Sequence, residues 1–123
     1  MSFVGKELNR IVLAQTTLGT SEAIVTNPTL KDTSITYLIM NNSHSSAITV
    51  TLSLVPNNNG SLGTAAAANV FFSESLDAGE TALLTGEDLR IWLNATNDSL
   101  QGFVSVASKV NVFAFGVSMS NQE

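Results

Sequence analysis

The feature that most limits the fold of this chain is the alternating run ITVTLSLV at residues 48–55. Apolar side chains occupy every second position, and threonine or serine fills most of the positions between them. Alternation with a period of two, carried by β-branched side chains, is typical of a strand that buries one face. The positions predicted to face a core are Ile48, Val50, Leu52 and Leu54.

A second apolar run, TSITYLIM at residues 33–40, precedes the first and is separated from it by the polar segment NNSHSSA. Asparagine and serine favour turns because their short side chains bond to nearby backbone groups. We therefore predict an antiparallel β-hairpin that supplies two central strands. In its first strand, Ile35, Tyr37 and Ile39 are expected to share one face.

Seven further segments are predicted to be strands, with turn formers such as Asn27-Pro28 and Asp77-Ala78-Gly79 between them. The earliest segment also fits the spacing of a short amphipathic helix. The last two are expected to form a hairpin that turns near Ser108 and Lys109. The predicted segments are residues 8–17, 21–26, 70–76, 80–85, 89–94, 100–107 and 110–119.

This series of strands and turns predicts one all-β domain over residues 1–123. We expect a single antiparallel β-sandwich of about eight strands, with jelly-roll or immunoglobulin-like topology. Residues 1–7 are expected to form a flexible N-terminal arm. Residues 57–69 are expected to form a long loop, and a loop of that length inside a compact domain is often functional.

The charge and hydropathy of the chain argue against two classes of partner. The formal net charge is −5 and the five basic residues are scattered, so binding to a nucleic-acid backbone is disfavoured. No apolar run approaches the ~20 residues of a membrane span, and the first residues do not resemble a signal peptide. We expect no nucleic-acid or membrane partner, and synthesis in the cytoplasm without signal-dependent export.

No group of residues predicts catalysis, a cofactor or a metal. The chain has one histidine, His44, and no cysteine, whereas a hydrolytic triad and a zinc site both depend on such residues. Calcium prefers clustered oxygen ligands, which gives a calcium hypothesis at Asp77 with Glu80 and at Glu87 with Asp88. The competing interpretation is that these acids face water and cap their turns. We predict a protein that is not an enzyme.

Apolar residues on predicted outward faces carry the strongest functional signal. If Leu89, Ile91 and Leu93 face the core, Trp92 faces outward. One interpretation is that loops, the second sheet or a β-bulge bury such residues. The other is that they form an interface, in a homodimer or homotrimer or with another protein, because contiguous apolar patches mark binding surfaces. The interface candidates are Trp92, Phe103, Phe71, Leu38, Met40, Phe113 and Phe115.

Three stretches form a recognisable series: ITVTLSLVPNNNG, then NVFFSESLDAGETALLTGEDLRIWLNATN, then VSVASKVNVFAFGVSM. This series, over about residues 34–119, resembles small β-sandwich structural proteins of tailed bacteriophages. In those proteins a strand ending in Val-Pro leads into a variable loop, and an Ala-Gly-Glu-Thr turn follows, here Ala78 to Thr81.

The resemblance implies a location in the virion and a role without catalysis. The implied role is that of a capsid cement (decoration) protein or of a tail or head–tail accessory protein. The partner would be the major capsid protein or another virion protein. The resemblance transfers no specific functional residue.

A glycan- or receptor-binding module is a further alternative. In that case Trp92 or Tyr37 would stack against a sugar ring, although aromatic residues make up only 7 % of the chain. An enzyme is the least supported class, because no catalytic motif is present.

Overall fold

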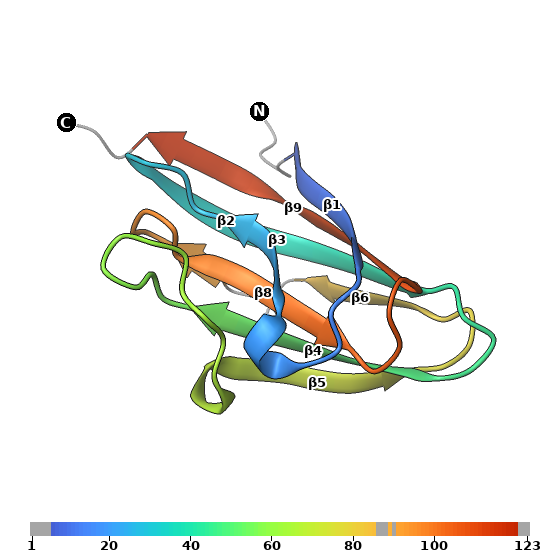
Figure 1. The fold of residues 1–123 in the computed structure, drawn as a ribbon. Coiled ribbons are helices and arrows are strands. Elements are labelled where there is room, and N and C mark those ends of the chain that lie inside the picture. Colours follow the sequence, from blue (N-terminus) through green and yellow to red (C-terminus); the bar gives the residue numbers. More distant parts are fainter. Residues whose placement is uncertain (1–5, 86–88, 90, 121–123) are drawn as a thin grey trace.

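Two antiparallel sheets pack face to face in the computed structural model of the chain, which describes residues 6–85, 89 and 91–120 (Figure 1). This confirms the predicted all-β sandwich. Two short 3₁₀ turns, η1 (Leu18–Thr20) and η2 (Ala67–Asn69), lie between strands. The strands in chain order are β1 (Lys6–Leu13), β2 (Glu22–Thr26), β3 (Lys31–Asn42), β4 (Ile48–Val55), β5 (Val70–Leu76), β6 (Thr81–Thr85), β7 (Ile91–Leu93), β8 (Ser99–Val104) and β9 (Val110–Ser120).

The order of the strands gives the sandwich a jelly-roll topology. Sheet A has the order β1-β9-β3-β6, with β7 also pairing with β3, and sheet B has the order β2-β8-β4-β5. β6 and β7 pair with different halves of β3 and together take the place of one strand. The first strand thus pairs with the last, the second with the next to last, and β4 with β5, as in the double Greek key of a jelly roll.

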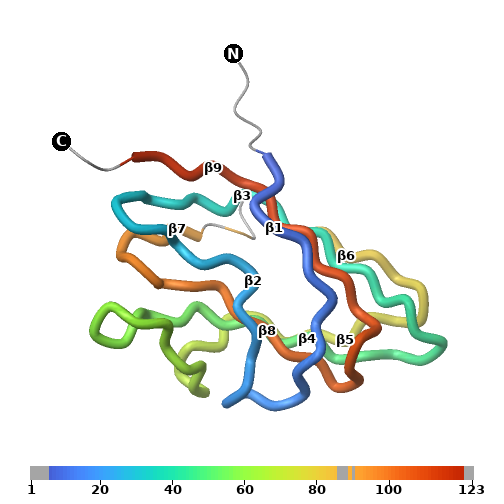
Figure 2. The backbone as a smooth tube through the Cα atoms, turned by 45° about the horizontal axis from the view of Figure 1, so that its top comes forward, coloured from blue at the N-terminus to red at the C-terminus, as the bar shows by residue number. Residues whose placement is uncertain are grey.

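The two predicted hairpins are wrong, because the strands of each pair lie in different sheets. β3 belongs to sheet A and β4 to sheet B, and β9 and β8 are separated in the same way (Figures 1 and 2). Each sheet has an apolar inner face, and the inner faces of the two sheets cover each other across the core. The alternation determines which face of a strand is buried, but it does not determine the neighbouring strand.

The core lies between the inner faces of the two sheets. The alternation predicted for β4 is confirmed, because Ile48, Val50 and Leu52 are no more than 1 % exposed, and Leu54 packs against the core from a half-buried position. The other large, fully buried apolar side chains are Leu13, Ile24, Ile35, Leu38, Met40, Leu100, Val104, Val110 and Val112.

A β-bulge at Thr36 decides which side chains of β3 face the core. The pairing with β9 shifts between Ile35 and Tyr37, so Thr36 is the extra residue. Ile35 faces the core, whereas Tyr37 and Ile39 are only partly buried on the opposite side. The expectation that these three residues share a face is therefore wrong. Beside the bulge, β9 carries Gly116, where a Cβ atom would lie 1.9 Å from a carbonyl oxygen of β3.

The bulge also corrects the prediction for two interface candidates. Leu38 and Met40 point into the core and are fully buried. They therefore contribute nothing to an exposed surface. One extra residue reverses the faces of the rest of a strand, and a simple alternation read from the sequence misses this reversal.

Asn27, a buried asparagine, fixes the point where the chain passes from sheet B into β3. Backbone groups that leave a sheet lose their ladder partners and need others. The Asn27 amide nitrogen donates to the carbonyl oxygens of Lys31 and Ala95, at 2.7 and 3.0 Å. Its side-chain oxygen accepts a 2.7 Å hydrogen bond from the hydroxyl of Thr33.

Asn42 has the same role where the chain leaves β3 for sheet B. Its side chain is fully buried, and its Nδ2 lies 3.0–3.1 Å from the carbonyl oxygens of Ser46, Leu76 and Asp77. Its Oδ1 accepts the backbone N–H of His44 at 2.9 Å. Asn42 thereby ties the β3–β4 connection to the turn between β5 and β6.

The long loop between β4 and β5, residues 56–69, is attached to the domain by hydrogen bonds at several points. Gln101 on β8 donates through Nε2 to the carbonyl oxygen of Gly63 at 2.9 Å, and Asn97 donates through Nδ2 to that of Gly60 at 2.8 Å. The backbone N–H of Asn57 donates to Asp98 at 2.9 Å. The loop therefore lies beside sheet B and is held there.

The predicted arm of residues 1–7 falls partly on the described chain. Lys6 and Glu7 belong to β1 and pair with β9, so a flexible arm does not extend to them. Residues 1–5 lie outside the described residues. The helical alternative for residues 8–17 is excluded, because β1 continues to Leu13.

Replacing the buried asparagine at the end of β3 is expected to destabilise the fold. Asn42→Ala leaves buried carbonyl groups without a donor, which costs about 3 kcal/mol of unfolding free energy. The neighbouring Asn41→Ala is the matched control, because Asn41 is only half-buried and bonds to the exposed Thr81 hydroxyl; its cost is expected within about 0.5 kcal/mol. Urea denaturation measures both. Equal losses for the two variants would contradict this role of Asn42.

Candidate interaction surface

The side of sheet A that faces away from the core carries a continuous set of apolar side chains. Residues paired across antiparallel strands point to the same face. Ile39 pairs with Phe113 on one side and with Leu83 on the other, and Tyr37 pairs with Phe115. We call this set the outer face of sheet A, and its apolar members are Val12, Tyr37, Ile39, Leu83, Trp92, Phe113, Phe115, Val117 and Met119.

The aromatic members of this face pack against one another and against a cation. The rings of Tyr37 and Phe115 meet edge to face, with centroids 5.5 Å apart. The Arg10 guanidinium lies 5.8 Å from the centroid of the Phe113 ring, within the range of a cation–π contact. Arg10 also pairs with Glu7 at 3.0 Å. Charge therefore sits at the β1 border of the face and apolar rings at its centre, the arrangement of a protein interface.

Several members of the outer face remain accessible to solvent. Trp92 is 54 % exposed, Leu83 51 %, Met119 48 % and Val12 45 %. The other members are half-buried by their neighbours within the sheet. In Figure 2 the described chain leaves β9 and β3 uncovered on the side away from sheet B. Exposed apolar patches are typical of binding surfaces, so this face is the candidate interaction surface.

The corresponding side of sheet B has a different character. Its central strands carry the buried polar side chains Thr51, Ser53 and Gln101, with the half-buried Phe103 beside Thr51. The Gln101 bond to Gly63 shows that the 56–69 loop reaches this side. The two outer sides of the sandwich are therefore unlike, and sheet A carries the larger apolar surface.

The remaining interface candidates divide between the two sheets. Trp92 points outward as predicted, since Ile91 and Leu93 beside it are 4–5 % exposed. Phe113 and Phe115 lie on the same outer face. The other two belong to sheet B: Phe103 is half-buried on β8 and Phe71, 40 % exposed, lies on β5. The seven candidates therefore do not form one surface.

Sequence reasoning missed Ile39 and Leu83, which join the aromatic cluster to the sheet edge. Simple alternation predicts Ile39 on the same face as the buried Ile35, but the bulge between them places Ile39 on the opposite face. Leu83 belongs to the short apolar segment TALLT, whose neighbours on both sides give no alternation long enough to fix its orientation. The pairing with β3 supplies that orientation.

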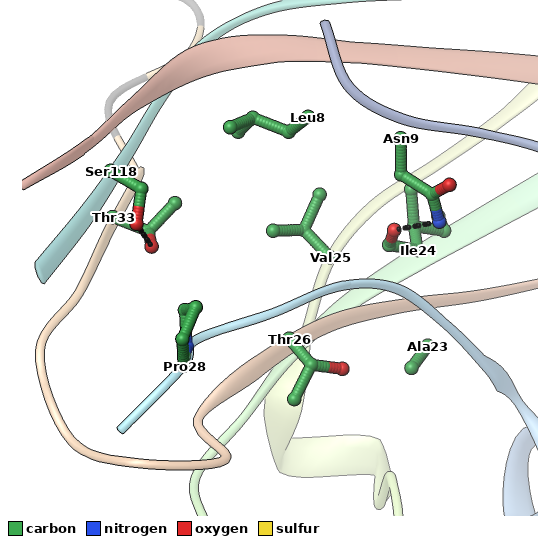
Figure 3. A pocket seen from close by; sticks show the side chains of 9 residues that line it. All are labelled: Leu8, Asn9, Ala23, Ile24, Val25, Thr26, Pro28, Thr33 and Ser118. Carbon is green, nitrogen blue, oxygen red and sulfur yellow. Dashed lines mark hydrogen bonds between the residues drawn. The ribbon is translucent and has the colours of Figure 1, made fainter. Parts of the chain in front are cut away.

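A pocket of about 290 Å³ opens between the edge strands β1 and β2 (Figure 3). Its lining is mainly apolar, and three of its polar side chains, Asn9, Thr33 and Ser118, have hydrogen-bond partners. The Asn9 amide donates to the carbonyl oxygen of Ile24 at 2.8 Å, and the hydroxyls of Thr33 and Ser118 are 3.1 Å apart. No titratable side chain is among the described residues that line it.

A second cavity, of about 210 Å³, is lined by Trp92, Pro56 and Asp98, among others. The Asp98 carboxylate accepts hydrogen bonds from the backbone and side chain of Asn57, both at 2.9 Å, and from the backbone of Ala95 at 3.1 Å. Burial by itself raises the pKa of Asp98, but these hydrogen bonds outweigh it and hold the pKa below its ordinary value.

The other candidate chemical groups are placed as follows. His44 lies in the β3–β4 connection and is half-buried. The Glu80 carboxylate accepts the backbone N–H of Asp77 at 2.7 Å, which caps the turn. Glu87 and Asp88 lie outside the described residues. Within the described chain, no three His, Cys, Asp or Glu side chains gather as a metal site, and no helix is long and apolar enough to cross a membrane.

Comparison with known proteins adds no relative. No family model matches the chain, and searches of curated proteins and of solved structures find no match.

The hydrogen bonds to Asp98 predict a pH-dependent contribution to stability. Because its folded pKa is lowered, the stabilisation is present above the unfolded pKa and is lost as the pH falls through the folded pKa. We expect Asp98→Asn to be less stable than the wild type at pH 7, and the difference to shrink below about pH 4.

Urea denaturation over this pH range measures the difference. Glu74→Gln is the control for the loss of one charge, because Glu74 is exposed on β5. A gap between wild type and Asp98→Asn that stays constant with pH would contradict the assignment.

Proposed function

We propose that this protein is a non-enzymatic structural protein of a virus particle, a cement protein that docks on an assembled bacteriophage capsid. The observation that carries the proposal is the outer face of sheet A, an apolar surface with aromatic residues at its centre that no described part of the chain covers (Figure 2). Aromatic residues are enriched at the energetic centres of protein interfaces.

The resemblance noted in the sequence supports the choice of particle. Jelly rolls occur in viral capsid proteins, and also in lectins and cupins. This likeness is an analogy between folds, and one fold hosts many functions. The analogy favours a structural role in a virus particle. The apolar outer face of sheet A favours docking on another protein over catalysis.

The partner is expected to present an apolar patch in a neutral or basic surrounding. The chain carries a formal net charge of −5, so an acidic partner surface would repel it. A cement protein stabilises a shell by mass action, because it binds the assembled lattice and not the free subunits. Contacts to two neighbouring subunits add avidity.

Trp92 supports a second candidate, the binding of a glycan by a tail or receptor-binding protein. The indole is 54 % exposed and lines the cavity that contains Asp98. Sugar recognition also needs polar groups that are free to bond with hydroxyls, yet Asp98 already accepts three hydrogen bonds. We therefore rank this candidate below docking.

A charge placed on the docking face is expected to abolish particle stabilisation. Trp92→Asp puts a carboxylate in the outer face of sheet A, where it would be desolvated on docking. Phe71→Asp is the matched control, since Phe71 is also an exposed aromatic residue but lies on β5 of sheet B. Particles stripped of the protein are reconstituted with each variant and challenged with heat or low ionic strength.

We expect wild type and Phe71→Asp to restore particle survival, and Trp92→Asp to leave it at the level of stripped particles. The proposal fails if stripped and complete particles survive equally well. If only Phe71→Asp loses the effect, the docking surface is on sheet B instead. Binding of Trp92-dependent glycans without any effect on particles would favour the second candidate.

A further inference from the structure

β6 is an outermost strand of sheet A whose own sequence carries none of the usual protection against pairing. It runs over Thr81–Thr85 with the sequence TALLT, and its pairing with β3 has no register shift. It contains no charge, proline or bulge, which are the common devices that block an open edge. In the described chain its only strand partner is β3.

The strand beside β6 on β3, β7, is only three residues long, and short length is itself a protection. The other edge strands carry charges or bulges. β1 has a bulge between Glu7 and Asn9 and includes charged side chains. β2 has a bulge between Ala23 and Val25. On β5, Glu74 pairs with the core residue Val50, so a charge stands on the inward side of that edge. β6 is the exception.

The direction of the free backbone groups on β6 follows from its pairing. The N–H of Asn42 donates to the carbonyl oxygen of Glu80, and backbone groups of alternate residues along a strand point to the same side. Ala82 and Leu84 therefore bond toward β3. The N–H and C=O groups of Thr81, Leu83 and Thr85 point to the open edge.

We propose that β6 pairs with β6 of a second copy of this chain, antiparallel and centred on Leu83. The segment is self-complementary in that register: Leu83 faces Leu83, Thr81 faces Thr85, and the small Ala82 faces the larger Leu84. Threonine–threonine and aliphatic cross-strand pairs are favourable. No like charges become neighbours within the paired segments, although the chain carries a net charge of −5.

This pairing joins the apolar faces of the two copies. Leu83 pairs with Ile39, which pairs with Phe113. This row of cross-strand apolar neighbours would continue from Leu83 of one copy to Leu83 of the second copy. Antiparallel pairing keeps both outer faces on one side of the combined sheet. The dimer therefore presents a docking face twice as wide as that of one chain. This consequence depends on the proposed docking function, whereas the dimer itself does not.

The test is a pair of opposite charges at Leu83, measured by analytical ultracentrifugation of the purified chain. Leu83→Glu and Leu83→Lys each place like charges opposite one another, and each is expected to raise the dimer dissociation constant at least tenfold. An equimolar mixture of the two variants is expected to form heterodimers, because opposite charges then face each other. Native mass spectrometry identifies the heterodimer by its mass.

Leu62→Glu and Leu62→Lys are the matched controls. Leu62 is 49 % exposed in the 56–69 loop, close to the 51 % of Leu83, and both control variants are expected to dimerise like the wild type. Circular dichroism confirms that each variant is folded. Restoration by mixing excludes misfolding as the cause of dissociation.

The proposal is overturned if the wild type stays monomeric up to about 0.5 mM, well above the micromolar range of small interfaces. It is also overturned if both Leu83 variants dimerise as the wild type does, or if their mixture forms no heterodimer. This experiment contains no capsids. A negative result would therefore overturn the dimer without bearing on the proposed capsid docking.

Discussion

The sandwich depends on how the chain enters and leaves β3. This strand pairs with β9, β6 and β7, so most of sheet A is assembled on it. Both of its ends lead to sheet B, and at each end a fully buried asparagine bonds the backbone groups that leave the ladder. A buried carbonyl group without a hydrogen-bond donor would cost about 1–3 kcal/mol of stability. By supplying these donors, Asn27 and Asn42 fix the position of one sheet relative to the other.

A local irregularity in the same strand shapes the proposed docking surface. The bulge at Thr36 keeps Ile35, Leu38 and Met40 in the core while Tyr37 and Ile39 point outward. With Gly116 allowing close approach beside the bulge, the aromatic residues of β9 meet Tyr37 on the outer side. Core packing and the apolar outer face are thus two consequences of one extra residue.

The strands and the buried positions of β4 could be predicted from the sequence, because alternation and turn residues are local signals. The pairing partners of the strands could not be predicted. The alternation from Ile48 to Leu54 would be the same whether this strand paired with the preceding one in a hairpin or packed against it from the other sheet. The burial of Leu38 and Met40 could not be predicted either, because the position of a bulge depends on the pairing with the neighbouring strand. Trp92 was placed correctly, since no bulge intervenes between Ile91 and Leu93.

Hydroxyl-radical footprinting of the protein, free and bound to assembled capsids, tests the docking face most directly. Oxidation of Tyr37, Trp92 and Phe113 is expected to fall severalfold on binding, because these residues become covered. Oxidation of Phe71 and Leu62, which lie outside this face, is expected to stay unchanged. Protection of Phe71 and Leu62 with continued oxidation of Trp92 would contradict docking through sheet A.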